Sequence, residues 1–354
     1  MFLFSRKYRQ LLGLDITTSS IKLIELAMAG GQYRVEAYAA EPTPPNSMNE
    51  KSIVDPQAVG DAINRAVKRS GARSTEVAIA ISGDAAITKI IQMPGGLRDS
   101  ELESQVEMQA DQYIPFPMDE VRYDFELLGP SDKDPDAVDV LLVASRTDNV
   151  DQRRAAVAAA GLSPRIVDVE AFALENACKL MTHQMPDGGI DRSIAVVDFG
   201  ASSTTFSVLR NLRVVYTRDF TFGGQQLTEE IMRTYGLSME EAGRAKKEGG
   251  LPGNYQAEVL DPFIDDMTQQ ISRSLQFYLA SGTGREQPVK ILICGGCANI
   301  PGVADVVQSR VGIDAERGDP LGQMKLSARA RAQAVQRDAT ALLTACGLAL
   351  RSFD

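Results

Sequence analysis

The sequence predicts an α/β protein with two related domains and a small α+β unit inserted into the first. The chain has 354 residues, a length that suits two domains of ~100–200 residues each. Apolar strands and amphipathic helices follow one another in two series, which open near residues 11 and 193. An apolar strand, an Asp and a small polar turn occur at Asp15 and again at Asp198. Such self-similarity indicates two related halves.

Residues 8–84 are expected to form the N-terminal part of the first domain. Strands with period-two alternation come first, and the Gly30–Gly31 pair supplies a turn between two of them. Asp55 is a suitable helix cap, and Pro56 suits the first helical turn. The expected elements are strands at 11–15, 21–26 and 33–39, a helix at 55–70 and a strand at 76–83.

Residues 85–161 are predicted to be a self-contained α+β insert. Its first helix carries Leu102, Val106 and Ala110 on one face, which we expect to pack on the insert's own sheet rather than on a partner. The expected elements are strands at 87–94, 122–128 and 138–144, and helices at 97–113 and 149–160.

Residues 162–190 are expected to continue the first domain, 191–335 to form the second, and 336–354 to return to the first as a terminal helix. The basic, alanine-rich stretch 321–337 is predicted to be a helix with a solvated face. The other expected elements are strands at 194–200, 204–209, 214–220 and 289–296, and helices at 171–181, 225–235, 238–248, 262–280 and 339–350.

Composition excludes several classes of function. The chain has 37 Lys and Arg against 47 Asp and Glu, a net charge of −10, so it has no overall attraction for nucleic acid. It has one histidine, His183, expected at the surface, and four cysteines, which is a poor supply for zinc or imidazole chemistry. Cys294 and Cys297 form a C-x-x-C, but no cation flanks them, so a structural role is favoured over a redox one.

We expect a cytoplasmic protein. No stretch reaches the ~18 consecutive apolar residues of a membrane span. The N-terminal nine residues place their charges after the apolar residues, which is the wrong order for a signal peptide. Membrane proximity would then come through a partner.

The two repeated turns suit phosphate binding. Small turn residues let backbone N–H groups approach phosphate oxygens. The Asp at each strand end, Asp15 and Asp198, can hold magnesium through water, and Lys22 can reach a phosphate as a point charge. The alternative is that both are ordinary hairpins.

At these residues the sequence resembles the actin-like (ribonuclease H-like) ATPase superfamily, which includes actin, the heat-shock ATPases, sugar kinases and FtsA. The resemblance covers about residues 12–350 and implies ATP or ADP and Mg²⁺ as cofactors. Glu170 matches the position that orients the attacking water, so it is the catalytic candidate. The resemblance implies nucleotide contacts in the first phosphate loop (Asp15, Thr17, Thr18, Ser19, Lys22), the second (Asp198, Gly200, Ala201, Ser202), the segment covering the adenosine (Gly223, Gly224, Lys246, Lys247) and the adenosine loop (Gly295, Gly296, Asn299).

Within the superfamily the chain is most similar to the PilM family of type IV pilus assembly. The insert falls where FtsA and PilM carry an FtsA-type small subdomain, and 113–116 and 140–146 look like PilM features. The chain stops at Asp354, whereas FtsA continues into an amphipathic helix. The resemblance implies a role in twitching motility and binding of the cytoplasmic N-terminal tail of PilN, in a groove beside the insert. It further implies a location at the inner face of the inner membrane, with other pilus inner-membrane or motor components and a homo-oligomer as further partners.

One departure from the superfamily pattern affects turnover. Thr17 stands where many relatives have glycine, and a β-branched residue is costly if that position needs a positive φ. ATP binding, with slow hydrolysis left open, is therefore the expectation. Two alternatives stay open: a small-molecule kinase, with Asp219 or Glu170 as base, and a structural adaptor that does not use nucleotide.

Overall fold

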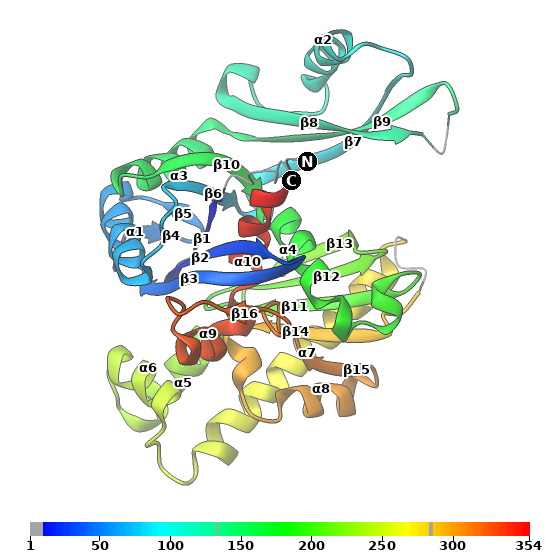
Figure 1. Ribbon diagram of the computed structural model, residues 1–354. Coiled ribbons are helices and arrows are strands. Elements are labelled where there is room, and N and C mark those ends of the chain that lie inside the picture. Colours follow the sequence, from blue (N-terminus) through cyan, green and yellow to red (C-terminus); the bar gives the residue numbers. More distant parts are fainter. Residues whose placement is uncertain (1–9, 132–133, 283–285) are drawn as a thin grey trace.

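Two sheets form the body of the computed structural model, which describes residues 10–131, 134–282 and 286–354 (Figure 1). They share an order of five strands, to which the first sheet adds a sixth. In each sheet three consecutive antiparallel strands are followed by two strands parallel to the first of them. The nine N-terminal residues, whose charge order argued against a signal peptide, lie outside the described ranges.

The first sheet has the order β10-β6-β1-β2-β3-β16. A tight turn joins its two longest strands, and both turn glycines adopt a positive φ, 61° at Gly30 and 79° at Gly31, which glycine tolerates without steric cost. The strands are β1 (Leu12–Ile16), β2 (Ser20–Ala29), β3 (Gln32–Pro42), β6 (Glu76–Ile81), β10 (Ser163–Val169) and β16 (Lys325–Leu326).

The second sheet has the order β13-β12-β11-β14-β15 and repeats the directions of the first. Asp15 and Asp198 occupy equivalent positions, near the ends of β1 and β11, opposite Lys22 and Thr205 on the next strands. The repeat that the sequence predicted is therefore a repeat of sheets. The strands are β11 (Ser193–Phe199), β12 (Thr204–Arg210), β13 (Arg213–Phe220), β14 (Lys290–Gly295) and β15 (Asp314–Arg317).

Two short helices, α4 (Glu170–Cys178) and α10 (Leu343–Leu350), pack between the two sheets. A Cβ added at Gly347 would overlap the carbonyl group of Ala173, and one at Gly13 would overlap that of Ala345. Glycine therefore allows α10 to lie directly against α4 and β1. On the outer side of the first sheet, α1 (Pro56–Ser70) packs beside α3 (Thr147–Ala159), and Asp55 caps α1 by accepting a 3.0 Å hydrogen bond from the Ala58 N–H.

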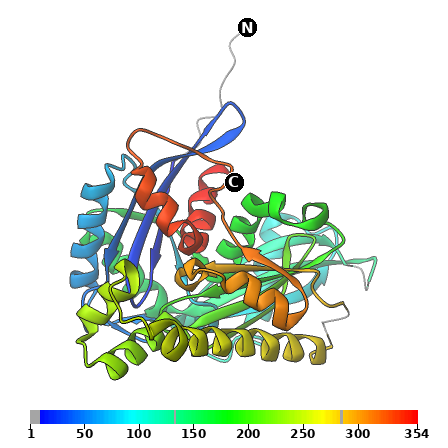
Figure 2. The same cartoon turned by 90° about the horizontal axis from the view of Figure 1, so that it is seen from below.

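Helices of the second domain cover its sheet with an aromatic core. Phe222 stacks on Phe263 at 5.3 Å between ring centroids, and Phe199, Phe206 and Tyr278 are buried near them. The long helix α7 (yellow in Figure 2) packs with α8 in this layer. The helices are α5 (Gly224–Tyr235), α6 (Met239–Glu248), the π-turn η5 (Gln256–Leu260) that runs into α7 (Asp261–Ala280), and α8 (Val303–Val311).

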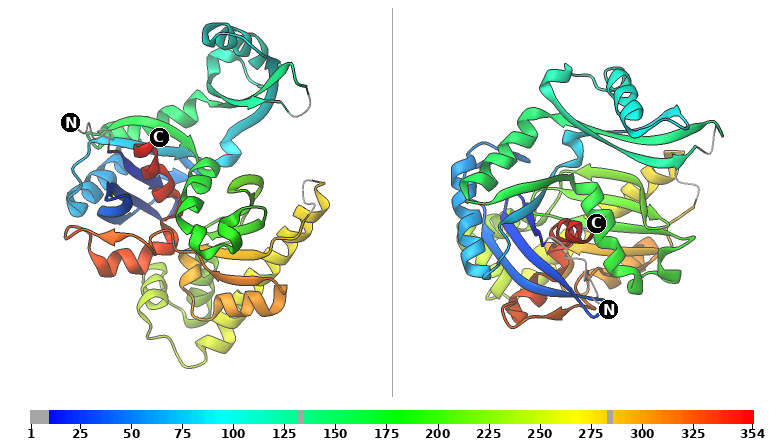
Figure 3. Two further views of the ribbon diagram at one scale, coloured as in Figure 1. Left: turned by 45° about the vertical axis from the view of Figure 1, so that its right-hand side comes forward. Right: turned by 45° about the horizontal axis from the view of Figure 1, so that its top comes forward.

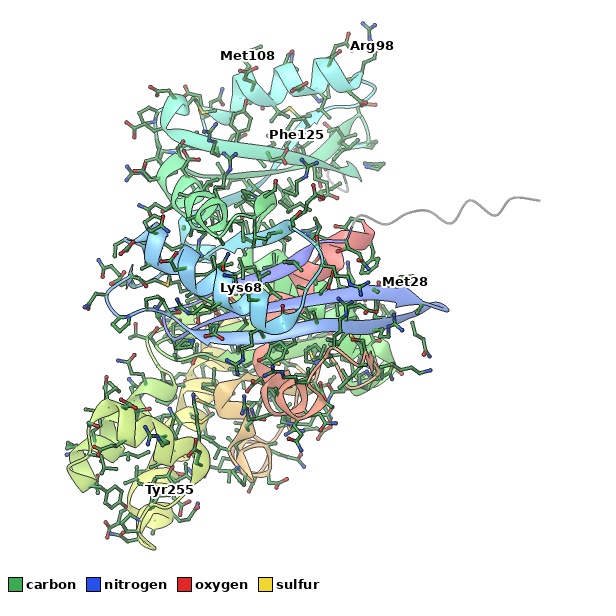
Figure 4. The ribbon with its side chains drawn as sticks, turned by 60° about the vertical axis from the view of Figure 1, so that its left-hand side comes forward. Met28, Lys68, Arg98, Met108, Phe125 and Tyr255 are labelled. Atoms are coloured by element: carbon green, nitrogen blue, oxygen red, sulfur yellow. The ribbon has the colours of Figure 1, made fainter. Side chains whose placement is uncertain are left out.

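The insert stands apart from the body as one helix on a three-stranded sheet (Figure 3). The second helix that the sequence placed in the insert, at 149–160, is α3, which packs beside α1 of the first domain instead. Its elements are β7 (Ala86–Pro94), α2 (Asp99–Ala110), β8 (Val121–Pro130) and β9 (Ala137–Arg146). Leu102, Val106 and Ala110 of α2 are buried against the sheet, which confirms the expected packing. Phe125 lies beneath α2, whereas Met108 points outward (Figure 4).

The prediction of a helix over residues 321–337 is wrong. The chain forms the short strand β16, which pairs in parallel with β3, and only then a short helix, α9 (Ala332–Asp338). Arg329 does not lie on a solvated face, because its guanidinium lies 2.8 Å from the Glu36 carboxylate and 3.9 Å from that of Glu25. Both carboxylates are buried, so this cation offsets the cost of burying them. In the described ranges no helix is long and apolar enough to cross a membrane.

Candidate functional site

The first repeated turn pairs a buried carboxylate with a lysine. Asp15 on β1 and Lys22 on β2 are cross-strand neighbours, and Lys22 Nζ lies 2.8 Å from Asp15 Oδ2. Burial lowers the pKa of Lys22, but Asp15 and, less strongly, Asp198 outweigh this effect and raise the pKa overall. Lys22 therefore carries its charge between the acids of both turns.

Thr17 fits the turn without strain. Its φ is negative, so the β-branched side chain has no left-handed backbone to oppose. Its hydroxyl donates to the Ser20 carbonyl at 2.8 Å, and its N–H donates to the same oxygen at 3.0 Å. The concern that Thr17 disturbs this loop is therefore removed. Ser19, at the tip, is exposed.

The second turn is fixed to the start of α5. The N–H of Gly224 donates to the Gly200 carbonyl at 3.0 Å, and that of Gln225 donates to the Ala201 carbonyl at 2.8 Å. A Cβ at Gly223 would overlap the Ala201 carbonyl, so this approach requires glycine. The turn and the helix N-terminus consequently form one rigid unit.

The two turns meet at the junction between the domains. The hydroxyl groups of Thr18 and Ser202 lie 3.2 Å apart, within hydrogen-bond distance. Burial raises the pKa of Asp198 to about 6, an effect that Lys22 opposes and Asp15 supports. Two acidic groups and one cation thus share a small, poorly solvated space between two turns rich in small residues.

The adenosine-loop candidates lie in two places. Gly295, with φ 83°, ends β14 directly beside Asp198, and a Cβ there would come within 2.6 Å of Asp198 Oδ1. Gly296 borders open space. The Asn299 side chain points away from the two turns. Its amide donates a 3.0 Å hydrogen bond to the carbonyl of Arg337, on α9. Asn299 is therefore a positioning residue for the loop, and the structure does not bring its side chain to the two turns.

The two lysine candidates on α6 differ. Lys246 Nζ donates to the Gly224 carbonyl at 2.7 Å and to the Thr228 hydroxyl at 2.6 Å, at the start of α5. Burial lowers its pKa. Lys247 is exposed. Lys246 is thus close to the second turn, whereas Lys247 remains at the surface of α6.

Glu170 begins α4 on the first-domain side of the junction. Its side chain is 29% exposed, and its Oε2 lies 3.8 Å from Lys51 Nζ. Burial raises the pKa of Glu170 to about 7, against the opposing effect of Lys51 and Arg153. A carboxylate poised near neutral pH can accept a proton from water or orient it.

Sequence reasoning missed Lys51 altogether. It lies in the hairpin of β4 (Met48–Asn49) and β5 (Ser52–Ile53), and its Nζ is 2.6 Å from Asp219 Oδ2 on β13. The other Asp219 oxygen accepts a hydrogen bond from the Thr205 hydroxyl at 2.7 Å. No motif marks Lys51, because it follows a Pro-rich loop without periodic pattern.

The histidine and cysteine expectations agree with the structure. His183 is exposed on a 3₁₀ turn. Cys294 and Cys297 are free and buried, and burial raises the pKa of Cys297 to about 11 and that of Cys294 well above its usual value. Protonated, buried thiols are poor nucleophiles, which supports a structural role.

The duplicated sheets, with a turn from each meeting at the domain junction, define an actin-like α/β protein. The comparisons are specific about which one. Residues 13–353 match the family described as type IV pilus assembly protein PilM, so the chain belongs to the PilM family.

Two examples show which solved structures this chain is similar to. One, the "PilM-PilN type IV pilus biogenesis complex", is 29% identical, with a TM-score of 0.79 over 98% of this chain and 99% of that one. The ethanolamine utilization protein EutJ from Carboxydothermus hydrogenoformans is 17% identical, with a TM-score of 0.54 over 97% of this chain and 89% of that one. The second likeness shows the fold alone.

Proposed function

We propose that this PilM-family protein binds ATP or ADP with Mg²⁺ between its two domains and couples nucleotide state to capture of the cytoplasmic tail of PilN. Nucleotide binding is supported by the contact between the two equivalent turns. Thr18 of one turn contacts Ser202 of the other, and Lys22 lies between Asp15 and Asp198. A ligand with several phosphates is the kind of molecule that two facing anion-binding turns and one lysine fit.

The donor set fits magnesium held mainly through water. Two carboxylates, Asp15 and Asp198, converge there, and in the parts of the chain that the structure describes no cluster of three or more His, Cys, Asp or Glu could hold a metal. Mg²⁺ keeps several waters and takes few direct protein ligands beside nucleotide phosphates, so two acids suffice. When bound, the ion would screen charge on the terminal phosphates.

Glu170 is the residue that we propose for orienting the attacking water in a slow hydrolysis. Its raised pKa keeps it partly protonated near neutral pH, and Lys51 and Arg153 favour its ionised form. A carboxylate that accepts a proton from water in this way contributes to hydrolysis only when a nucleotide places the phosphate nearby.

PilN binding is supported by the similarity to the PilM-PilN complex and by one face of the insert sheet. The side chains of Ile90 and Leu141 point to the face of the insert sheet opposite α2, and Asp124 and Glu126 share it; we name these four residues the open face. Ile90 is 63% exposed. An apolar centre with an acidic border suits a tail that carries basic residues, as cytoplasmic segments of inner-membrane proteins do.

On this proposal the protein acts at the inner face of the inner membrane, attached through PilN, in pilus assembly and twitching motility. Contacts with other pilus inner-membrane or motor components and self-association belong to the same proposal. The net charge of −10 gives no support to nucleic acid as a partner.

The test is titration calorimetry of the full chain with Mg-ATP and, separately, with a PilN tail peptide. We expect both to bind, and Asp15→Ala or Asp198→Ala to weaken Mg-ATP by about tenfold or more because each removes a charge-assisted contact. Asp305→Ala, an exposed change on α8, is the matched control. If neither ligand binds, the proposal is wrong.

Two other functions remain to be compared. A structural adaptor is favoured by the pairing of Lys22 with Asp15, which satisfies the lysine without a phosphate; unchanged pilus assembly in Asp15→Ala and Asp198→Ala strains would establish it. A small-molecule kinase is less well supported, since Lys51 and Thr205 occupy both oxygens of Asp219. ATP consumption stimulated by a sugar panel would favour the kinase.

A further inference from the structure

Lys51 links the two domains next to the second phosphate turn, close enough for its charge and that of Asp219 to act on Asp198. The residue belongs to the first domain, and its ammonium lies 2.6 Å from Asp219 on β13, a strand of the second sheet. It also lies 3.8 Å from Glu170 and 4.0 Å from Asp84, both outside the second domain. One cation therefore serves three carboxylates, and only the contact with Asp219 crosses to the other domain.

The surroundings hold Lys51 in place. The buried guanidinium of Arg153 donates to the Lys51 carbonyl at 2.9 Å, which fixes the backbone of the β4–β5 hairpin. Burial lowers the pKa of Lys51, but Glu170 and Asp219 outweigh this effect and raise the pKa overall. The ammonium thus stays charged at physiological pH and reaches Asp219 from a fixed base.

Asp219 also connects Lys51 to the strand that follows the second phosphate turn. Its other oxygen accepts the Thr205 hydroxyl at 2.7 Å, and Thr205 is the cross-strand neighbour of Asp198. The series Lys51, Asp219, Thr205 therefore joins the hairpin of one domain to the strand that follows the turn of the other.

We propose that Lys51 is a latch between the domains: its ion pair with Asp219 holds the first and second domains together, and losing the pair lets them separate more readily. Both partners are partly exposed, 25% for Lys51 and 29% for Asp219, so the pair is weak enough to open and close. A latch of this kind biases the hinge without depending on a bound nucleotide.

The latch can be measured as the distance between spin labels in the nucleotide-free full chain. The four native cysteines are buried, so maleimide or thiosulfonate labels go to cysteines introduced at exposed Lys68 on α1 and Glu248 on α6, one in each domain. We expect Lys51→Met and Asp219→Asn each to raise the population of the longer distance by about two- to fivefold. The double variant should open no further than either single variant.

Arg310→Met is the matched control, because it removes a cation whose partner, Asp265 at 2.6 Å, lies in the same domain. It should leave the distance distribution as in the wild type. If Lys51→Met and Asp219→Asn also leave the distribution unchanged, the latch is disproved. If only Lys51→Met opens the molecule, its first-domain partners are responsible and the cross-domain role is rejected. Because no nucleotide is present, failure of nucleotide binding does not affect this result.

Discussion

At the scale of single residues, Glu170 shows how burial sets the chemistry of one carboxylate. The side chain sits near two cations, Lys51 and Arg153, which favour its ionised form, yet burial dominates and brings its pKa to about 7 from an ordinary value of 4.5. The folded state therefore prefers the protonated acid more than the unfolded chain does. By linkage, this preference stabilises the fold fully below pH 4.5 and is lost as the pH rises toward 7.

Glu170→Gln should consequently stabilise the protein at alkaline pH, because glutamine cannot ionise in this partly buried position. The gain in free energy of unfolding over the wild type should be about 2 kcal/mol larger at pH 8 than at pH 5. Urea unfolding at both pH values measures it. Glu107→Gln, at an exposed position on α2, is the control and should show no such difference. A gain that is equal at both pH values would contradict the linkage.

Residue-level prediction from the sequence succeeds where partners are close along the chain. Asp15 and Lys22 are cross-strand neighbours in one hairpin, so alternation and a short turn were enough to place them in the same hairpin, although their ion pair was not predicted. Lys51 and Asp219 are 168 positions apart, and their contact depends on how two domains pack. No local pattern carries that information, and for the same reason the direction of the Asn299 amide toward Arg337 was not foreseen.

At the scale of elements, the packing of α10 on α4 depends on one missing side chain. Gly347→Ala should lower the free energy of unfolding by about 1–3 kcal/mol, because the new Cβ meets the Ala173 carbonyl, which belongs to a backbone that cannot easily move. Gly243→Ala on α6 is the matched control: its Cβ meets nothing within 4 Å, so it should stabilise by about 0.5–1 kcal/mol. Chemical denaturation of both variants measures these two changes in the free energy of unfolding. A neutral Gly347→Ala would show that α10 can shift outward.

The open face of the insert sheet gives a second prediction at this scale. Ile90→Asp should weaken binding of the PilN tail peptide by about tenfold or more, since it puts a charge in the apolar centre of the face. Met108→Asp, at a 68% exposed position on the opposite side of the insert, should bind as the wild type does. Calorimetry with the peptide and a melting curve for each variant make the comparison. Equal losses in both variants would place the tail elsewhere.

Elements with strong periodicity were foreseen, and the exception has a physical cause. The stretch 321–337 has the alanines and spaced cations of a solvated helix, which favours helix on local grounds alone. In the fold, Arg329 forms ion pairs with the buried acids Glu25 and Glu36. Leu326 lies in a short strand and pairs with Val35 of β3. Tertiary contacts with the first sheet therefore override the local preference.

At the scale of the whole molecule, the duplicated topology was predictable because each half repeats its own local signal. Both hairpins carry an apolar strand, an acid and a small turn, and both sheets continue with parallel strands. What no repeat could predict is how the halves contact one another, through Thr18 with Ser202 and Lys51 with Asp219. Under the proposed latch, these contacts couple domain opening to the turns that we propose as the nucleotide site.

Under the proposed function, that coupling has a reciprocal consequence. If Mg-ATP binds better to the closed molecule and closure changes how the insert meets the body, then ATP changes PilN-tail affinity, and the tail changes ATP affinity by the same factor. We expect a factor of about five or more, measured by titrating each ligand in the absence and in the presence of saturating amounts of the other. Asp15→Ala should abolish the effect of ATP while leaving tail affinity in its absence unchanged. Tail affinity that is identical with and without ATP would mean that the two sites are independent, and the adaptor alternative would then account for the protein better.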